Sequence, residues 1–157
     1  MDNFKLIVAK SKNNVIAVDG QIPWHLSKDL QFFKHMTLGS TLVCGRKTFD
    51  SLGNKPLGHR DMIVISRKKQ PGVKTMHSLT ECLNYIDLNK DKTFWCIGGG
   101  EIYYSLLPFV SEMIITQIRV DVDDPDAIKF PAFYTRDFTR YSTHHTQEFD
   151  VVCYAKP

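Results

Sequence analysis

Asp29 is the acidic residue best placed to do chemistry, because it falls on the apolar side of a helix predicted over Ser27–Thr37. The residues expected to face the core recur at helical spacing: Leu26, Leu30, Phe33 and Thr37. Asp29 shares this face or its edge, and a carboxylate buried alone is costly unless it is paired or hydrogen-bonded. The alternative is an acid in the first helical turn that faces solvent, stabilised by the helix dipole. The helix alone leaves both interpretations open.

Three predicted strands end in residues suited to binding phosphate. Gly45-Arg46-Lys47-Thr48 opens a helix, whose free N–H groups and positive dipole end attract anions. Ser66-Arg67-Lys68-Lys69 offers a hydroxyl and cations that suit a monophosphate, such as the 2′-phosphate of NADPH. Gly98-Gly99-Gly100-Glu101 lets the main chain approach a ligand closely. Each segment also has a structural explanation, which is a helix cap for the first, a basic surface turn for the second and a tight turn without ligand for the third. The three together favour a phosphorylated cofactor.

Short apolar runs that alternate with helix-like segments must position these residues. The predicted strands are Lys5–Ala9, Thr41–Cys44, Met62–Ser66, Thr93–Ile97 and Met113–Val120. The predicted helices are Ser27–Thr37, with Ser27 as N-cap, Lys47–Leu52, Leu79–Asn89 and Glu101–Phe109. Two further extended runs, Phe138–His145 and Phe149–Ala155, surround a turn. The pattern predicts a single α/β domain over residues 1–157. Its mostly parallel central sheet has helices on both faces and ends in a C-terminal antiparallel hairpin. In such sheets ligands bind at the carboxyl ends of the strands.

Composition excludes several other classes of protein. The 157 residues carry a formal charge of +3, with 43% hydrophobic and 24% charged residues, which is ordinary for a globular protein. No Lys/Arg block suggests a track for nucleic acid, and no apolar run has the length of a membrane span. The cysteines Cys44, Cys82, Cys96 and Cys153 form no C-x-x-C pair and are expected to be buried thiols in a reducing compartment. No signal peptide is evident, so we expect a cytoplasmic protein, by default a monomer.

Taken in chain order, these fragments resemble dihydrofolate reductase from end to end. The matching pieces are Leu6-Ile7-Val8-Ala9, Val15-Ile16, Ile22-Pro23-Trp24 with Asp29, Leu30-x-x-Phe33-Lys34, Gly45-Arg46-Lys47-Thr48-Phe49-x-Ser51-Leu52-Gly53, Pro56-Leu57-Gly58-x-Arg60, Ile97-Gly98-Gly99-Gly100-Glu101-Ile102-Tyr103, Thr116 and Phe130-Pro131. Any one fragment is weak, but the ordered set is specific. The resemblance implies reduction of 7,8-dihydrofolate to tetrahydrofolate by hydride transfer from NADPH, and binding of antifolate inhibitors.

The resemblance also implies roles for individual residues. Asp29 is expected to bind the 2-amino group and N3 of the pterin, with Thr116 supporting it and Trp24 holding a nearby water. The proton for N5 is expected to arrive through water. Arg60 is expected to pair with the glutamate α-carboxylate of the substrate. The substrate site as a whole is expected to comprise Ile7, Val8, Asp29, Leu30, Phe33, Ser51, Leu52, Arg60, Ile97, Tyr103 and Thr116.

For the cofactor the resemblance implies a second set, with no metal. Ala9, Ile16 and Tyr103 would flank the nicotinamide, and Gly98–Gly99 would be joined by a cis peptide. The whole set is Ala9, Ile16, Gly45, Arg46, Lys47, Thr48, Ser66, Arg67, His77, Ile97, Gly98, Gly99, Gly100, Glu101, Ile102 and Tyr103.

Two segments depart from the family pattern. Ala17 stands where the family usually has glycine, and Asp121–Lys129 is longer than the corresponding passage, with Asp124 and Asp126 as candidates for a loop contact. Two other functions compete with a folate reductase: a related reductase of ribosylated pyrimidines in flavin synthesis, and a non-catalytic module that binds NADPH. The first needs a phosphate-recognising substrate pocket, whereas Asp29 with Phe33, Leu52 and Arg60 favours a folate.

Overall fold

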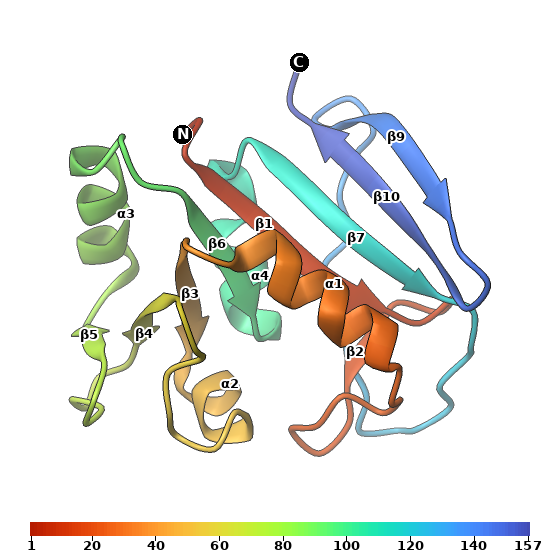
Figure 1. Ribbon diagram of the computed structural model, residues 1–157, viewed down its shortest axis with the longest axis horizontal. Coiled ribbons are helices and arrows are strands. Elements are labelled where there is room, and N and C mark those ends of the chain that lie inside the picture. The colour runs from red at the N-terminus through yellow and green to blue at the C-terminus, as the bar shows by residue number, and fades with distance from the viewer.

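The main sheet of the computed structural model, which describes all 157 residues, has eight strands in the order β5-β4-β3-β6-β1-β7-β10-β9 (Figure 1). Their bounds are β1 Phe4–Lys10, β3 Thr41–Gly45, β4 Asp61–Ile65, β5 Lys74–Met76, β6 Phe94–Gly98, β7 Glu112–Ile118, β9 Thr139–His145 and β10 Phe149–Ala155. The neighbours from β5 to β7 pair in parallel, whereas β10 pairs antiparallel with β7 and β9. The predicted parallel sheet with a C-terminal antiparallel hairpin is therefore confirmed.

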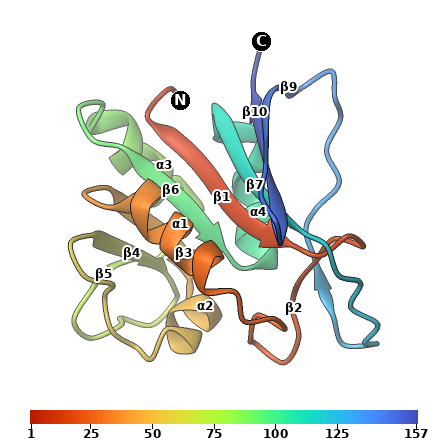
Figure 2. The same ribbon diagram turned by 45° about the vertical axis from the view of Figure 1, so that its right-hand side comes forward.

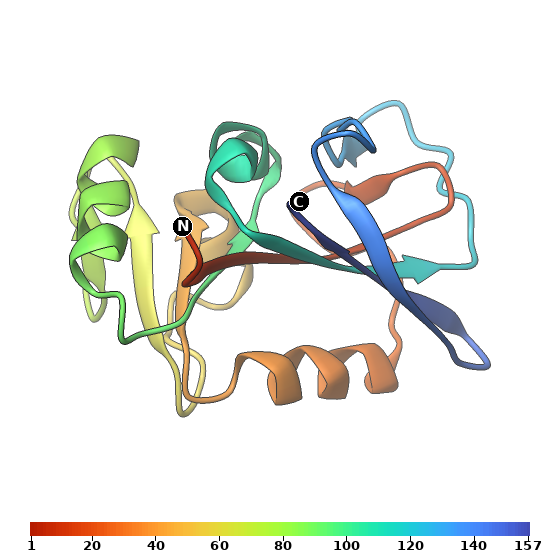
Figure 3. The same cartoon turned by 90° about the horizontal axis from the view of Figure 1, so that it is seen from above.

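Helices cover both faces of this sheet. They are α1 Ser27–Thr37, α2 Arg46–Ser51, α3 Leu79–Leu88 and α4 Gly100–Leu106, which is followed by a 3-10 turn over Leu107–Phe109. Seen from above, α1 lies on one face, while α3 and α4 lie on the other (Figure 3). The arrowheads of β1 and β6 point toward the lower edge of the sheet, where α2 lies (Figure 2).

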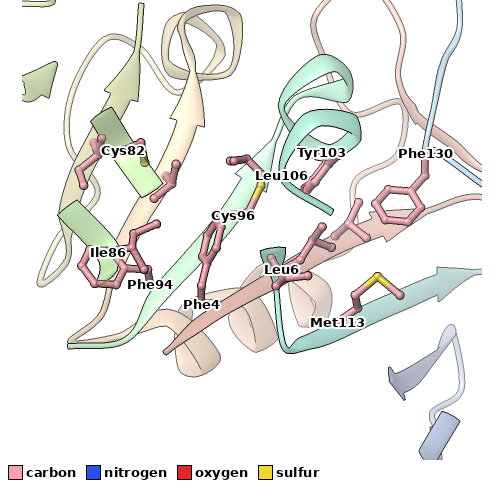
Figure 4. Close-up of a cluster of buried hydrophobic side chains, with 14 of the residues drawn as sticks. Phe4, Leu6, Cys82, Ile86, Phe94, Cys96, Tyr103, Leu106, Met113 and Phe130 are labelled. Carbon is pink, nitrogen blue, oxygen red and sulfur yellow. The ribbon is translucent and has the colours of Figure 1, made fainter. Parts of the chain in front are cut away.

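The core consists of two apolar clusters, one on each face of the sheet. Successive strand side chains point to opposite faces, so Leu6 and Val8 of β1 join one cluster and Ile7 joins the other. Figure 4 shows the first cluster, in which Tyr103 and Leu106 of α4 pack over strand residues such as Leu6. The second cluster is covered by α1, and the side chains of interest for chemistry lie against it.

Two expectations about α1 are wrong. Its N-cap is Leu26, which makes no side-chain cap bond, and Ser27 is already inside the helix. Leu30 is 58% exposed and not in the core. Each helical residue turns by about 100° relative to the one before it, so burying Asp29 turns Leu30 toward solvent.

Three short strands were not predicted. β2 (Val15–Ala17) and β8 (Ile128–Lys129) form a separate antiparallel pair, and β5 extends the main sheet at its edge. Runs of two or three residues carry too little periodicity to be recognised. β2 and β8 connect the loop around Ala17 to the segment Asp121–Lys129, which are the two places where the sequence departs from the family pattern.

The N-terminus of α3 carries a complete side-chain cap, and its removal is expected to destabilise the fold. Ser78 Oγ accepts a hydrogen bond from the N–H of Glu81 at 3.1 Å, and Glu81 Oε2 accepts one from the N–H of His77 at 2.9 Å. We expect Ser78→Ala to lower the free energy of unfolding by about 1 kcal/mol, as measured by urea denaturation. Thr80→Ala, at an exposed position in the same turn, is the control. Equal losses in both variants would contradict a specific capping role.

Candidate active site

Asp29 is buried in the first turn of α1, with 7% of its surface exposed. This burial confirms the first interpretation of the sequence and excludes a solvated first-turn acid. Desolvation raises the pKa of the Asp29 carboxyl above its usual value, while Trp24 and Thr116, which approach it with polar hydrogens, act to lower that pKa. No Lys, Arg or His nitrogen lies within 4.0 Å of the carboxylate, so its charge has no partner among the basic side chains.

The two residues beside Asp29 come from different elements. Thr116 is a buried residue of β7, paired with Ala9 of β1 and Val151 of β10. Trp24 precedes α1, and its Nε1 is buried without an acceptor in full hydrogen-bond geometry. The N–H nevertheless lies close enough to the Asp29 carboxylate to lower the pKa of that carboxyl, so this buried donor is directed at the acid.

The unpaired burial of Asp29 predicts a stability cost that depends on pH. Because its folded pKa is raised, the folded state holds the proton more tightly than the unfolded state does. The free energy of unfolding therefore falls as pH rises from the pKa of Asp29 in the unfolded chain, about 3.9, to its higher pKa in the folded protein. Above the folded pKa, Asp29 is fully charged and the loss of stability is complete. We expect Asp29→Asn to be more stable than the parent at neutral pH, with the difference shrinking toward about pH 4.

Urea denaturation at several pH values checks this expectation. Asp91→Asn, at an exposed turn position, controls for removal of one negative charge. If the parent proved more stable than Asp29→Asn at neutral pH, Trp24 and Thr116 would have to outweigh the desolvation of the carboxylate.

Apolar side chains predicted to contact substrate gather on the face covered by α1. Ile7 is buried in the second cluster, and four half-buried side chains of the site pack against it: Trp24, Phe33, Leu52 and Ile97. Leu30 is exposed beside Asp29, and Ser51 is exposed at the end of α2, where its hydroxyl bonds the Thr48 carbonyl. Val8 and Tyr103 belong to the cluster on the opposite face, so their side chains do not join this group.

Arg60 is held at the C-terminal end of α1, whereas Asp29 lies at the N-terminal end. Its Nη1 donates to Thr37 Oγ1 at 3.1 Å, its Nε donates to the Gly58 carbonyl at 2.9 Å, and its guanidinium lies 6.0 Å from the centre of the Phe33 ring. No carboxylate of the chain lies within 4.0 Å of it. Thr37 was predicted only as a core position, and the one signal for more was a polar residue on an apolar helix face.

The predicted phosphate-binding residues lie at the carboxyl ends of β3 and β4. Gly45 ends β3, and Arg46 and Lys47 are exposed in the first turn of α2, where Arg46 makes only a loose ion pair with Asp50 at 3.8 Å. Beyond β4, the Ser66 carbonyl lies 3.0 Å from His77 Nδ1, and Arg67 is exposed. Gln70, which was not predicted as a site residue, fixes this turn through its Nε2, which donates to Ser66 Oγ at 3.3 Å and to the Lys68 carbonyl at 3.0 Å.

The glycine segment after β6 packs too closely for side chains. Gly98 and Gly99 are joined by a cis peptide, as predicted. Gly98 has φ +104°, and a Cβ there would lie 2.6 Å from the Tyr103 ring. A Cβ on Gly99 would lie 3.2 Å from Thr48 Oγ1. The Tyr103 hydroxyl donates to the Ile7 carbonyl at 2.8 Å, which fixes the ring beneath Gly98.

The remaining predicted cofactor residues surround this segment. Ala9 is half-buried near the end of β1, Ile16 is buried in β2, and Ile102 packs against Gly45. Gly100 and Glu101 line a shallow hollow of about 420 Å³ together with Tyr104, Ser105, Ile128 and Lys129. Asp124 caps its own turn by accepting from the N–H of Asp126, so its side chain has a structural role.

Fold and site together define an α/β domain with a buried acid against one face of the sheet and basic, glycine-rich segments at the carboxyl ends of its strands. The family model for dihydrofolate reductase matches residues 3–154. The dihydrofolate reductase of Haemophilus influenzae is 41% identical over 123 residues, which cover 76% of this chain and 74% of the relative. Dihydrofolate reductase type 3 of Salmonella typhimurium is 40% identical over 128 residues, 77% of each chain.

A solved structure agrees with these relatives. Dihydrofolate reductase from Enterococcus faecalis, complexed with NADP(H) and RAB-propyl, superposes with a TM-score of 0.85 at 31% identity, covering 98% of this chain and 95% of that one. The chain belongs to the dihydrofolate reductase family. None of its helices combines the length and apolar character needed to cross a membrane.

Proposed function

We propose that the protein reduces 7,8-dihydrofolate to 5,6,7,8-tetrahydrofolate with NADPH, and that Asp29 is the acid that binds the pterin. The observation that carries the residue assignment is the buried Asp29 carboxylate beside Thr116 and Trp24, without a basic partner. A carboxylate in this setting suits a ligand edge that presents two N–H donors, such as the 2-amino group and N3 of a pterin. Such an interaction supplies the charge partner that the protein itself does not.

The residues at the basic edge fit the cofactor. Arg46, Lys47 and Arg67 are exposed cations, and none is held in a close ion pair. A Cβ on Gly98 would collide with Tyr103 at 2.6 Å and one on Gly99 would lie tightly, 3.2 Å from Thr48 Oγ1, so glycine keeps this stretch of main chain free of side chains. We propose that NADPH is held by the whole cofactor set that the family resemblance implies, with Arg67, Ser66 and His77 toward its 2′-phosphate.

Within this proposal each group of the chain has one task. NADPH, when bound, supplies the hydride that reduces C6 of the pterin. Asp29 binds and orients the pterin and favours the protonated state of a weakly basic ring nitrogen. Thr116 holds the Asp29 carboxylate, and Trp24 directs its N–H toward the same place. Ile7, Phe33, Leu52 and Ile97 bury the ring and exclude bulk water, while Arg60 binds the glutamate carboxylate.

The test is the loss of NADPH absorbance in the presence of dihydrofolate. Turnover supports the proposal. Absence of turnover with dihydrofolate, combined with turnover of a ribosylated pyrimidine, would replace it with the related reductase of flavin synthesis. Tight NADPH binding without turnover of either substrate would leave a binding module.

We further propose that the enzyme acts as a monomer in the reducing environment of the cytoplasm. All four cysteines are free, and Cys44, Cys82 and Cys96 are buried. Burial raises the pKa of Cys44 and of Cys82 to about 12, so these thiols stay protonated and unreactive. Sedimentation of the purified protein tests the monomer.

A further inference from the structure

We propose that Thr37 is the positioning residue that aims Arg60 at the substrate carboxylate, and that it thereby sets the preference for pterins that carry glutamate over pterins that lack it. The inference rests on the proposed function, in which Arg60 binds that carboxylate. It adds a residue that does not itself contact the substrate.

The hydroxyl of Thr37 has a defined direction. Thr37 is the last residue of α1 and is fully buried. Its Oγ1 donates its only hydrogen to the Phe33 carbonyl at 2.8 Å. The oxygen is therefore left as an acceptor, and Arg60 Nη1 donates to it at 3.1 Å. Because the Phe33 carbonyl belongs to the helix, the position of this acceptor is fixed by α1.

Two other contacts complete the hold on Arg60. The Gly58 carbonyl accepts from Nε at 2.9 Å, and the Phe33 ring lies 6.0 Å from the guanidinium carbon. A guanidinium carries five N–H hydrogens in a planar fork. Nε donates its hydrogen to the Gly58 carbonyl, and Nη1 donates one of its two to Thr37 Oγ1. The second Nη1 hydrogen and both Nη2 hydrogens therefore remain free to bind a ligand. They form the end of the fork that binds a carboxylate with two parallel hydrogen bonds.

The consequence concerns binding and not the chemical step. The glutamate carboxylate lies away from the reacting pterin atoms, so its contact with Arg60 is the same in the ground state and in the transition state. Such uniform binding lowers KM without changing kcat. Loosening Arg60 is thus expected to raise KM only for substrates that carry the carboxylate.

The experiment compares 7,8-dihydrofolate with 7,8-dihydropteroate, which has the same pterin and benzoyl groups but no glutamate. Thr37→Val removes the acceptor while keeping the shape. We expect it to raise KM for dihydrofolate roughly tenfold, which is the loss typical of one hydrogen bond to a charged group. We expect kcat for both substrates and KM for dihydropteroate to stay within about twofold.

Three controls make the result specific. Thr37→Ser and Thr37→Ala both lose the methyl group, but only serine keeps the hydroxyl, so only alanine should lose the preference. Thr41→Val makes the same change at a second buried threonine, whose hydroxyl takes no part in the Arg60 contacts. This variant should keep the preference for dihydrofolate over dihydropteroate. In an Arg60→Gln background, Thr37→Val should add nothing to KM for dihydrofolate.

The outcomes separate this inference from the proposed function. A selective loss with Arg60→Gln, but none with Thr37→Val or Thr37→Ala, overturns the role of Thr37 alone. Equal losses on both substrates in the Thr37 variants also overturn it, because they indicate general damage. A parent enzyme that reduces neither substrate, or an Arg60→Gln variant with an unchanged preference, overturns the proposed site and the inference with it.

Discussion

Asp29→Asn is expected to lower kcat/KM for dihydrofolate at neutral pH by roughly a hundredfold or more, which is within the range for loss of one acid–base group. Asparagine keeps the size of the side chain and its position in α1, but it removes the negative charge that favours a protonated pterin. The buried setting enlarges the effect, because charges interact more strongly where water is excluded. The measurement is steady-state NADPH oxidation with dihydrofolate.

The NADPH affinity of the variant gives the control for its fold. We expect the dissociation constant for NADPH to stay within about threefold of the parent, since Asp29 lies on the substrate side. Asp91→Asn should retain full turnover. A variant at position 29 that kept the parent's kcat/KM would refute the assignment of Asp29, even if the enzyme reduced dihydrofolate.

Gly98→Ala is expected to be the most destabilising single-methyl change in the site, with a loss of about 3 kcal/mol or more in the free energy of unfolding. The new Cβ would lie 2.6 Å from Tyr103 Cε2 and 2.9 Å from Cζ. The ring cannot swing away, because its hydroxyl is bonded to the Ile7 carbonyl and only 4% of Tyr103 is exposed. The φ of +104° adds backbone strain for any residue other than glycine.

Gly53→Ala separates strain from collision. Gly53 has φ +84°, but no atom lies within 4 Å of the position of its Cβ. We expect this control to lose about 1 kcal/mol from strain alone, and to keep its NADPH affinity. Urea denaturation and fluorescence titration with NADPH give both quantities. If Gly98→Ala were no less stable than Gly53→Ala, collision with Tyr103 would not be what prevents a side chain at position 98.

Apolar segments were predictable from sequence, and local geometry was not. The strands β1, β3, β4, β6 and β7 were placed within a few residues, because strands covered on both faces consist of short, nearly continuous apolar runs. The cap at Ser27 was wrong because the helix begins one residue earlier than expected, with Leu26 as its N-cap. The burial of Leu30 was wrong because it depends on how α1 is rotated on the sheet. The contacts that accompany this rotation include Thr116 of β7 and Ile7 of β1, which are distant in sequence, as well as the nearby Trp24.

The site shows the same division. Asp29 was identified by its place on an apolar face, and the ordered resemblance supplied Thr116 and Arg60 as its companions. Thr37 and Gln70 were missed because their importance lies in which neighbour each one bonds. A hydroxyl or amide in the sequence gives no indication of whether its partner is solvent, a carbonyl or a guanidinium.

The order of strands also has a consequence for how the chain acquires its structure during synthesis. β1 lies between β6 and β7, with Phe4 opposite Phe94 and Lys5 opposite Glu112. β1 is synthesised well before either partner, so it stays unpaired until β6 and β7 have followed it, and such long-range pairing slows folding. In the meantime its apolar Leu6, Ile7 and Val8 are open to other nascent chains. The strand order therefore makes β1 the segment most exposed to aggregation while the chain is being made.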